Sequence, residues 1–199
     1  MEHTIIDSMK MRRSIYHLGK ELPISNDQLE ETVKEAVRLA PSAFNSQTSR
    51  AVILFGDEND WLWDLVWQKV KPLLAEGQEQ STKAKLAAFN SGAGTILFFE
   101  EMATVSQLEK DFPLYSENFR LWSQHASGLT QFAVWTALAE VGVGASLQHY
   151  GNLIEADVQA RYGLANTWSL IAQMPFGSIA GEPPAKRFGN IEERVLVRQ

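Results

Sequence analysis

The stretch Lys10-Met11-Arg12-Arg13-Ser14-Ile15-Tyr16 places two adjacent arginines and a serine between apolar residues, directly after a predicted N-terminal helix. Arginine keeps its charge at any working pH, and its planar fork of donors suits phosphate or carboxylate oxygens. The stretch therefore predicts an anion-binding segment. Taken alone it has a second interpretation as a solvated helix end, where basic side chains interact favourably with the helix dipole.

A second polar stretch, Pro41-Ser42-Ala43-Phe44-Asn45-Ser46-Gln47, follows the next predicted helix. Ser25 begins that helix, because Gln28 three positions later completes a capping box, and Pro41 ends it. Serine and asparagine hydrogen-bond to nearby backbone, so this stretch is also typical of a simple turn. Its position after the arginine run makes it a candidate binding turn.

The composition is that of an ordinary soluble globular protein, with 199 residues, 45% hydrophobic and 21% charged. A net charge of -6 argues against a nucleic-acid partner. The absence of cysteine excludes disulfides and cysteine nucleophiles and suits a reducing compartment. The sequence shows no secretory signal, and its longest strongly apolar run, 95–99, is too short to span a bilayer. We expect a cytoplasmic protein with no membrane partner.

The hydrophobic periodicity predicts a single α+β domain over residues 1–199, with a mixed central β-sheet flanked by helices. The stretch 102–113 is expected to hold short helical pieces and a loop. The long helix 114–141 carries Gly128 in its middle, which favours close packing against another element or a symmetry-related copy. The predicted helices are 3–11, 25–40, 61–75, 83–90, 114–141 and 154–162, and the predicted strands are 51–55, 95–99, 145–147 and 168–176.

Several kinds of active site are not supported. The four histidines are scattered, without the spacing of a metal site. No Gly-x-Ser-x-Gly elbow occurs, and Gly142-Val143-Gly144 follows a predicted helix instead of the strand that a dinucleotide fingerprint needs. The adjacent acids Glu100 and Glu101 suit an acid/base pair, but are more typical of the start of a loop. No metal site is predicted.

Together, the Arg-Arg-Ser run and the Pro-Ser-x-x-Asn-x-Gln run about thirty residues later resemble the FMN-dependent nitroreductase family. Pro41, Ser42, Asn45 and Gln47 match that second motif, while 48–49 (Thr-Ser) replace its usual Pro-Trp. The length and the order of elements are most similar to the small branch of fatty-acid-repression-mutant and copper-induced nitroreductases. The resemblance implies that family's fold and a homodimer with a long interface helix.

The resemblance also implies roles for individual residues. Arg12, Arg13 and Ser14 would bind the FMN phosphate and the polar edge of the flavin, and Lys186 and Arg187 would complete the phosphate site. The turn from Pro41, Ser42 and Ala43 to Asn45 would approach the flavin from the partner subunit. The segment Gln148, His149, Tyr150 and Gly151 would turn a backbone N–H toward the flavin. Phe44 and Trp122 are candidates to line the acceptor pocket, because flat aromatic acceptors stack on aromatic side chains, although most of the six tryptophans suit core positions.

Each of these roles has an ordinary structural alternative. His149 and Tyr150 also suit packed or solvent-facing positions, and Lys186-Arg187 a solvated pair. One departure from the family pattern is clear, since 101–107 offers neither the asparagine nor the lysine that many members place at flavin O4.

The implied activity is reduction of nitroaromatic compounds or quinones by FMN, with NADH or NADPH as the electron donor, in a ping-pong cycle that needs no protein nucleophile. The partners would be a second copy of the chain and a small aromatic electron acceptor. A flavin-binding stress-response or regulatory protein with incidental turnover would share every site residue. A helical interaction module without a cofactor would leave the arginine run unexplained.

Overall fold

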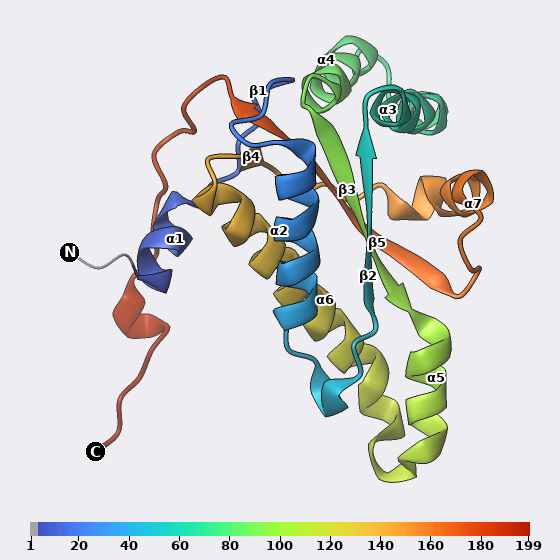
Figure 1. Cartoon of the computed structure of the whole chain (residues 1–199), viewed down its shortest axis with the longest axis vertical. Helices are drawn as coiled ribbons and strands as arrows, with labels where there is room; N and C mark the ends of the chain where they lie inside the picture. Colours follow the sequence, from blue (N-terminus) through green and yellow to red (C-terminus); the bar gives the residue numbers. More distant parts are fainter. Residues whose placement is uncertain (1–3) are drawn as a thin grey trace.

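The computed structural model describes residues 4–199, and within them the chain forms a central five-stranded sheet with the order β1-β5-β3-β2 and with β4 also paired to β5 (Figure 1). The pairings between these strands are antiparallel, and a bridge between Ser14 and Ala145 adds a parallel one. The predicted α+β class with a mixed sheet is confirmed. The strands are β1 (Leu18–Gly19), β2 (Ser49–Phe55), β3 (Gly94–Glu101), β4 (Gly144–Ala145) and β5 (Trp168–Ile179).

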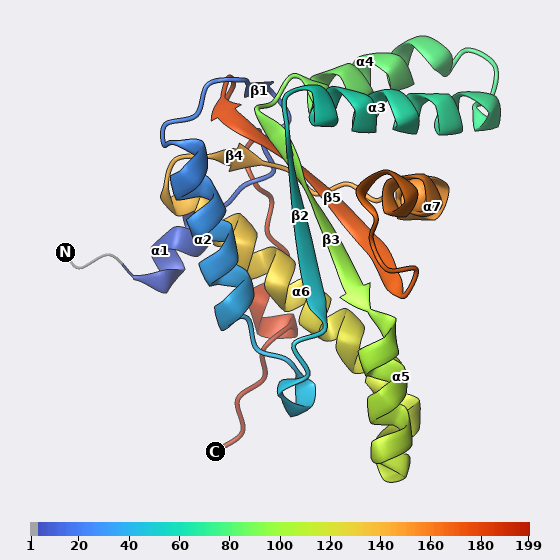
Figure 2. The same ribbon diagram turned by 45° about the vertical axis from the view of Figure 1, so that its right-hand side comes forward.

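Helices cover both faces of the sheet (Figures 1 and 2). Alternate residues of β3 face opposite sides. Ile96 and Phe98 pack against α2 and α6, whereas Leu97 and Phe99 pack against α3, α4 and α7. The helices are α1 (Ile5–Met11), α2 (Asn26–Leu39), α3 (Asp57–Val70), α4 (Glu79–Asn90), α5 (Met102–Asp111), α6 (Ser116–Glu140) and α7 (Gly151–Tyr162).

The capping signal in the sequence located one helix start correctly, whereas apolar periodicity alone placed three others too late. Ser25 and Gln28 form the predicted capping box at the start of α2. Three helices begin earlier than predicted, at Asp57, Glu79 and Gly151. The first turns of the helices at Asp57 and Glu79 are polar, so apolar periodicity did not mark them, although their acidic residues suit the positive end of a helix. The helix at Gly151 begins with a glycine and an asparagine. Residue 3, where the first helix was predicted to start, lies outside the described residues.

The prediction of a loose segment over 102–113 was wrong. Glu101 caps a regular helix there, because its side chain accepts a hydrogen bond from the N–H of Ala103 at 2.9 Å. Glu100 and Glu101 end β3 instead of starting a loop. The two-residue strand β1 was missed because it is too short to show a period. The third predicted strand proves to be Gly144–Ala145.

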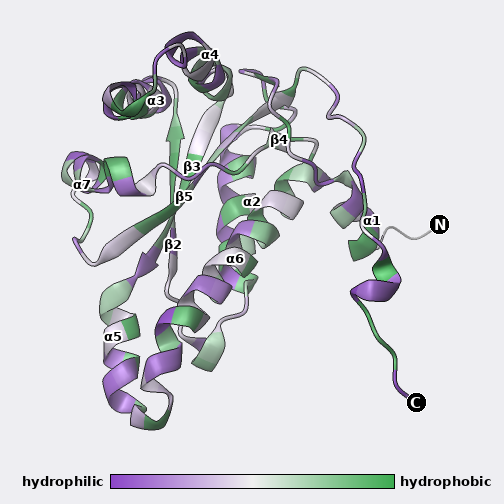
Figure 3. Ribbon diagram, turned by 180° about the vertical axis from the view of Figure 1, so that it is seen from behind, coloured by the Kyte–Doolittle hydropathy of each residue, from purple (hydrophilic) through white to green (hydrophobic). Residues whose placement is uncertain are grey.

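The sheet and its helices are in close contact near α7. A Cβ on Gly151 would lie 2.1 Å from the backbone oxygen of Leu170, so only glycine permits this approach of α7 to β5. The chain after β5 leaves the sheet (Figure 3), and both this segment and α1 carry exposed hydrophobic residues. In the part of the chain that is described, no helix combines the length and the hydrophobicity needed to cross a bilayer.

Candidate functional site

The arginine run lies against the end of the sheet. It follows α1, and the N–H of Ile15 donates to the backbone oxygen of Ala145 at 2.8 Å, next to the bridge between Ser14 and Ala145. Ile15 is buried, whereas Arg12, Arg13 and Ser14 are partly exposed. The sheet therefore holds the backbone of the run while its polar side chains stay accessible to a ligand.

Arg12 packs on a tryptophan of the long helix. Its guanidinium carbon lies 4.4 Å from the ring centroid of Trp135, within the range of a cation–π interaction. Burial, and then the charge of Arg13, lower the pKa of Arg12, but an arginine so placed remains charged at neutral pH. The indole Nε1 of Trp135 is buried and has no hydrogen-bond partner among the described residues. A buried donor without a partner, beside the Arg12 guanidinium, fits an anionic, acceptor-rich ligand.

Arg13 connects the run to the other end of the chain. Its Nη2 donates to the backbone oxygen of Pro184 at 2.5 Å. Lys186 and Arg187 follow two and three residues later, so the chain cannot carry them more than about 11 Å beyond Pro184. The structure thus brings the predicted basic residues from both ends of the sequence to one region.

The turn between α2 and β2 has an unusual backbone. Phe44, Asn45 and Gln47 have φ values of 56°, 51° and 47°, in the region that favours glycine. The turn is held by a hydrogen bond from the N–H of Gln47 to Ser42 Oγ at 2.9 Å. Such backbone conformations cost on the order of 1 kcal/mol each and concentrate at functional sites.

Five aromatic rings meet at this turn. The ring of Phe44 stacks on Trp122 of α6 with centroids 5.9 Å apart and planes 21° apart. Phe112, Tyr115 and Phe119, from the corner between α5 and α6, surround the same ring with centroids 4.8–5.7 Å from it. The structure thus brings together the two predicted acceptor-pocket residues, Phe44 and Trp122, and adds an aromatic wall that the sequence analysis did not identify.

The arginine run and the turn lie at different ends of α6. Arg12 contacts Trp135, and Phe44 contacts Trp122, thirteen residues earlier on the same helix. A rise of 1.5 Å per residue separates the two tryptophans by about 20 Å. Within one chain, therefore, the two motifs form separate surfaces.

The segment 148–151 is largely occupied by its own hydrogen bonds. Gln148 exchanges backbone hydrogen bonds with Gln173 of β5 at 2.7 and 2.8 Å. The N–H of Tyr150 donates to Gln173 Oε1 at 2.6 Å, and Tyr150 has a raised pKa because it is partly buried. Gly151 serves the packing of α7. The N–H groups of His149 and Gly151 make no hydrogen bond within the described residues, so these are the backbone donors of the segment that remain for a ligand.

A buried carboxyl lies at the start of β2. Glu100 is 0% exposed, and its Oε1 accepts a hydrogen bond from Ser49 Oγ at 2.5 Å. Its Oε2 and the hydroxyl of Thr48 are buried without a hydrogen-bond partner among the described residues. Burial raises the pKa of Glu100, while the hydrogen bond from the Ser49 hydroxyl and the charge of Arg50 oppose that shift. The residues that replace the family's Pro-Trp are thus those that contact this carboxyl.

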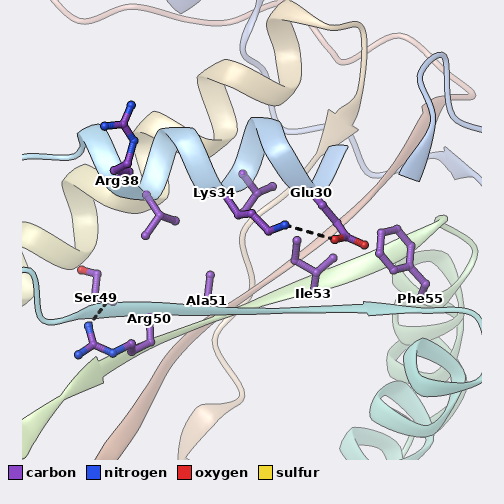
Figure 4. A pocket seen from close by; sticks show the side chains of 10 residues that line it. Glu30, Lys34, Arg38, Ser49, Arg50, Ala51, Ile53 and Phe55 are labelled. Atoms are coloured by element: carbon purple, nitrogen blue, oxygen red, sulfur yellow. Dashed lines mark hydrogen bonds and ion pairs between the residues drawn. The ribbon is translucent and has the colours of Figure 1, made fainter. Parts of the chain in front are cut away.

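A groove of about 550 Å³ between α2 and the edge strand β2 is a separate feature (Figure 4). Its charged side chains already have partners, since Lys34 lies 3.6 Å from Glu30 and Arg50 donates to the backbone oxygens of Gln47 and Ser49 at 2.7 and 3.1 Å. It contains none of the predicted site residues, so we do not assign the cofactor to it.

The described residues form an α+β fold that carries an arginine run after its first helix and a turn with positive φ angles after its second helix. The family model described as the Nitroreductase family matches residues 9–178. This chain belongs to the nitroreductase family.

Relatives of similar length support this assignment. HBN1 and the nitroreductase FRM2, both from Saccharomyces cerevisiae, are 34% and 32% identical to the chain over 187 residues, which is 93% of each protein. Nitroreductase CinD from Lactococcus lactis, solved with chloramphenicol, is 43% identical with a TM-score of 0.91, over 98% of this chain and 100% of that one. CinD has also been solved with 4-nitrophenol.

Several residues of this region were missed from sequence. Trp135 and Gln173 lie in a helix and a strand whose periodicity explains them as core, and nothing in the sequence shows that a buried N–H lacks a partner. Glu100 was visible as an acid, but its burial depends on the pairing of β3 with β2.

Proposed function

We propose that the protein is an FMN-containing oxidoreductase that uses NADH or NADPH to reduce nitroaromatic compounds or quinones by a ping-pong mechanism. The proposal is supported by membership of the family and by similarity to CinD, which has been solved with nitrophenol. The observation that carries it is the cluster of Arg12, Arg13 and the unpaired Trp135 N–H against the end of the sheet.

The phosphate and polar edge of FMN would be held by this cluster. Arg12 and Arg13 supply the charged fork donors, Ser14 a hydroxyl, and Lys186 and Arg187 further positive charge from the tail. Charge-assisted hydrogen bonds of this kind are about twice as strong as neutral ones. The His149 N–H is the backbone donor proposed to face the flavin. When bound, FMN supplies hydride transfer from the nicotinamide and to the acceptor.

A homodimer would complete the site. Gly128 lies midway between Trp122 and Trp135 and is exposed. Apart from its chain neighbours and the adjacent backbone of its own helix, no atom of the described chain lies within 4 Å of where its Cβ would be. Small residues allow helices to approach closely. If two antiparallel copies of α6 cross at Gly128, a two-fold axis brings Trp122 of one copy opposite Trp135 of the second copy. The Pro41–Ala43 turn of one copy then lies beside the arginine run of the other.

Exposed hydrophobic residues support such an interface. Ile5 is 66% exposed on α1, and Leu129 and Phe132 are 46% and 39% exposed on α6. A groove of about 630 Å³ runs between α1, α2 and α6 and includes Pro41. Contiguous exposed apolar surface of this kind marks protein interfaces.

The proposal is tested by an absorption spectrum of the purified protein. We expect flavin bands near one FMN per chain, bleaching under anaerobic conditions when NADH or NADPH is added, and recovery when a nitroaromatic or quinone follows. Flavin bands that are bleached by neither NADH nor NADPH would rule out a nicotinamide as the electron donor. A colourless protein that takes up no FMN would overturn the proposal, and bleaching without turnover would favour a regulatory flavoprotein.

A further inference from the structure

A small cavity lies between the Pro41–Ala43 turn and α6. Its volume is about 250 Å³, and Trp122, His125 and Leu129 form its helical wall. The cavity therefore lies between the Pro41–Ala43 turn, which is proposed to approach the flavin, and Trp122, which is proposed to line the acceptor pocket. Its size suits a single-ring aromatic molecule.

Reduction of the proposed acceptors consumes protons as well as electrons. A quinone becomes a hydroquinone when it gains a hydride and one proton. A nitro group likewise becomes a nitroso group when it gains a hydride and one proton, and one N–O bond breaks to release water. Protein acids that donate such protons in the transition state contribute about 10²–10⁴-fold to the rate.

His125 is the ionisable side chain among the residues that line the cavity. The other lining side chains are apolar, or carry only a hydroxyl or an indole. On the N-terminal side of His125 along α6, the nearest charged residues are Arg120, which lies 3.1 Å from Glu109, and Glu117. On the C-terminal side the nearest is Glu140. On α2 the nearest is Arg38, which is paired with Glu35. None of the other lining residues carries a charged group that could form an ion pair with the His125 imidazole or repel it.

We propose that His125 is the general acid of the acceptor half-reaction. This inference depends on the proposed function. The imidazolium donates its N–H proton to the acceptor oxygen as the acceptor takes the hydride. For a quinone this single proton completes the hydroquinone, and for a nitro group it completes the water molecule that leaves as the nitroso group forms. The neutral imidazole then regains a proton from solvent through the open side of the cavity.

The test compares acceptors that need protons with one that does not. Ferricyanide accepts electrons without a proton, whereas a para-quinone requires one. In His125→Gln we expect reoxidation by the quinone to slow about 100-fold, with reoxidation by ferricyanide, FMN content and reduction by the nicotinamide unchanged. Deuterated water should slow the quinone reaction of the wild type but not its ferricyanide reaction. His17→Gln, at another exposed histidine outside the cavity, should match the wild type in every measurement.

A binding measurement gives a readout that does not depend on turnover. The sequence has four histidines, and His125→Gln identifies the imidazole resonance of His125 in the oxidised holoprotein. Titration with 4-nitrophenol should shift that resonance and leave the His17 resonance in place.

Equal quinone rates in His125→Gln and the wild type would overturn the inference, as would a His125 resonance unmoved by 4-nitrophenol. Equal slowing with quinone and ferricyanide would also overturn it, because it indicates damage to the flavin environment and not loss of a proton. A wild type that binds no FMN would refute the proposed function itself.

Discussion

The guanidinium of Arg12 lies 4.4 Å from the ring centroid of Trp135, whose own N–H is buried without a partner in the described chain. Trp135 thus orients the Arg12 guanidinium through its ring and has an unpaired N–H donor beside it. Leaving a buried donor unpaired costs about 1–3 kcal/mol. A bound FMN that accepted this hydrogen bond would recover that cost, so the arrangement favours the loaded protein.

Trp135→Phe removes the donor and keeps an aromatic face for Arg12. We expect the dissociation constant of FMN to rise about tenfold, as loss of one hydrogen bond predicts. Quenching of FMN fluorescence on titration into the apoprotein measures it. Trp67→Phe on α3 is the matched control, because this tryptophan also carries a cation over its ring, with Lys71 Nζ 5.7 Å from the ring centroid. Trp67 and Lys71 both lie far from the arginine run in sequence. An unchanged affinity in Trp135→Phe would show that the indole N–H does not contact the cofactor.

Arg13→Ala removes a charged fork and the hydrogen bond that holds the tail at Pro184. Loss of charge-assisted hydrogen bonds should weaken FMN binding about 100-fold while leaving the fold intact. The ratio of flavin to protein absorbance after purification checks this, with circular dichroism as the measure of folding. Arg38→Ala, which removes an exposed arginine paired with Glu35, should keep its full colour. A fully yellow Arg13→Ala would contradict the phosphate assignment.

Gly128→Leu tests the proposed two-fold contact. Within the chain there is space for the new side chain, and leucine favours helix over glycine by about 1 kcal/mol, so each subunit should remain folded. If α6 crosses a second copy here, the added bulk should convert the dimer to a monomer and release FMN. Sedimentation velocity and flavin absorbance record both effects. Ala87→Leu, at an exposed position of α4, should stay dimeric and yellow. A Gly128→Leu dimer with full flavin would place the interface elsewhere.

Phe44→Leu tests the aromatic wall. An aromatic contact is worth about 0.5–1.5 kcal/mol beyond its buried area, so KM for a flat nitroaromatic should rise about 3–10-fold. FMN affinity and reduction by the nicotinamide should stay the same, because the turn backbone keeps its hydrogen bond from Gln47 to Ser42. Phe55→Leu, which removes a ring packed edge-on to Phe176, serves as the control. An unaltered KM would remove Phe44 from the acceptor pocket.

The fold was largely accessible from sequence, because its strands and helices follow apolar periodicity and its second helix has a capping box. The arginine run and the Pro41–Gln47 stretch were also recognisable as motifs. Their separation by about 20 Å along α6 was not, because it depends on which tryptophan each motif contacts. The aromatic wall was missed because the segment holding Phe112 and Tyr115 lacks a clear period. In the sequence, the adjacent acids Glu100 and Glu101 suggest the start of a loop. The burial of Glu100 follows from the pairing of β3 with β2, which the sequence does not show.

Burial at Glu100 predicts a pH dependence of stability. Its pKa is raised in the folded chain, chiefly because the carboxyl is removed from water. Between the ordinary glutamate pKa and this raised value, the unfolded chain has released the proton and the folded chain still holds it. The free energy of unfolding contributed by this group is therefore fully present at low pH and is lost as the pH rises through that window. A tenfold difference in proton affinity corresponds to about 1.4 kcal/mol.

Glu100→Gln should remove this dependence. Glutamine keeps an oxygen for the Ser49 hydroxyl and is neutral at every pH, like the protonated acid. Urea unfolding between pH 4 and pH 8 should show a flatter profile for the variant, with a gain over the wild type at the upper end. Glu109→Gln, which changes a carboxylate in an exposed ion pair with Arg120, should reproduce the wild-type slope. Parallel profiles for Glu100→Gln and the wild type would mean that Glu100 is ionised in the folded chain across this range, with its charge balanced by Arg50.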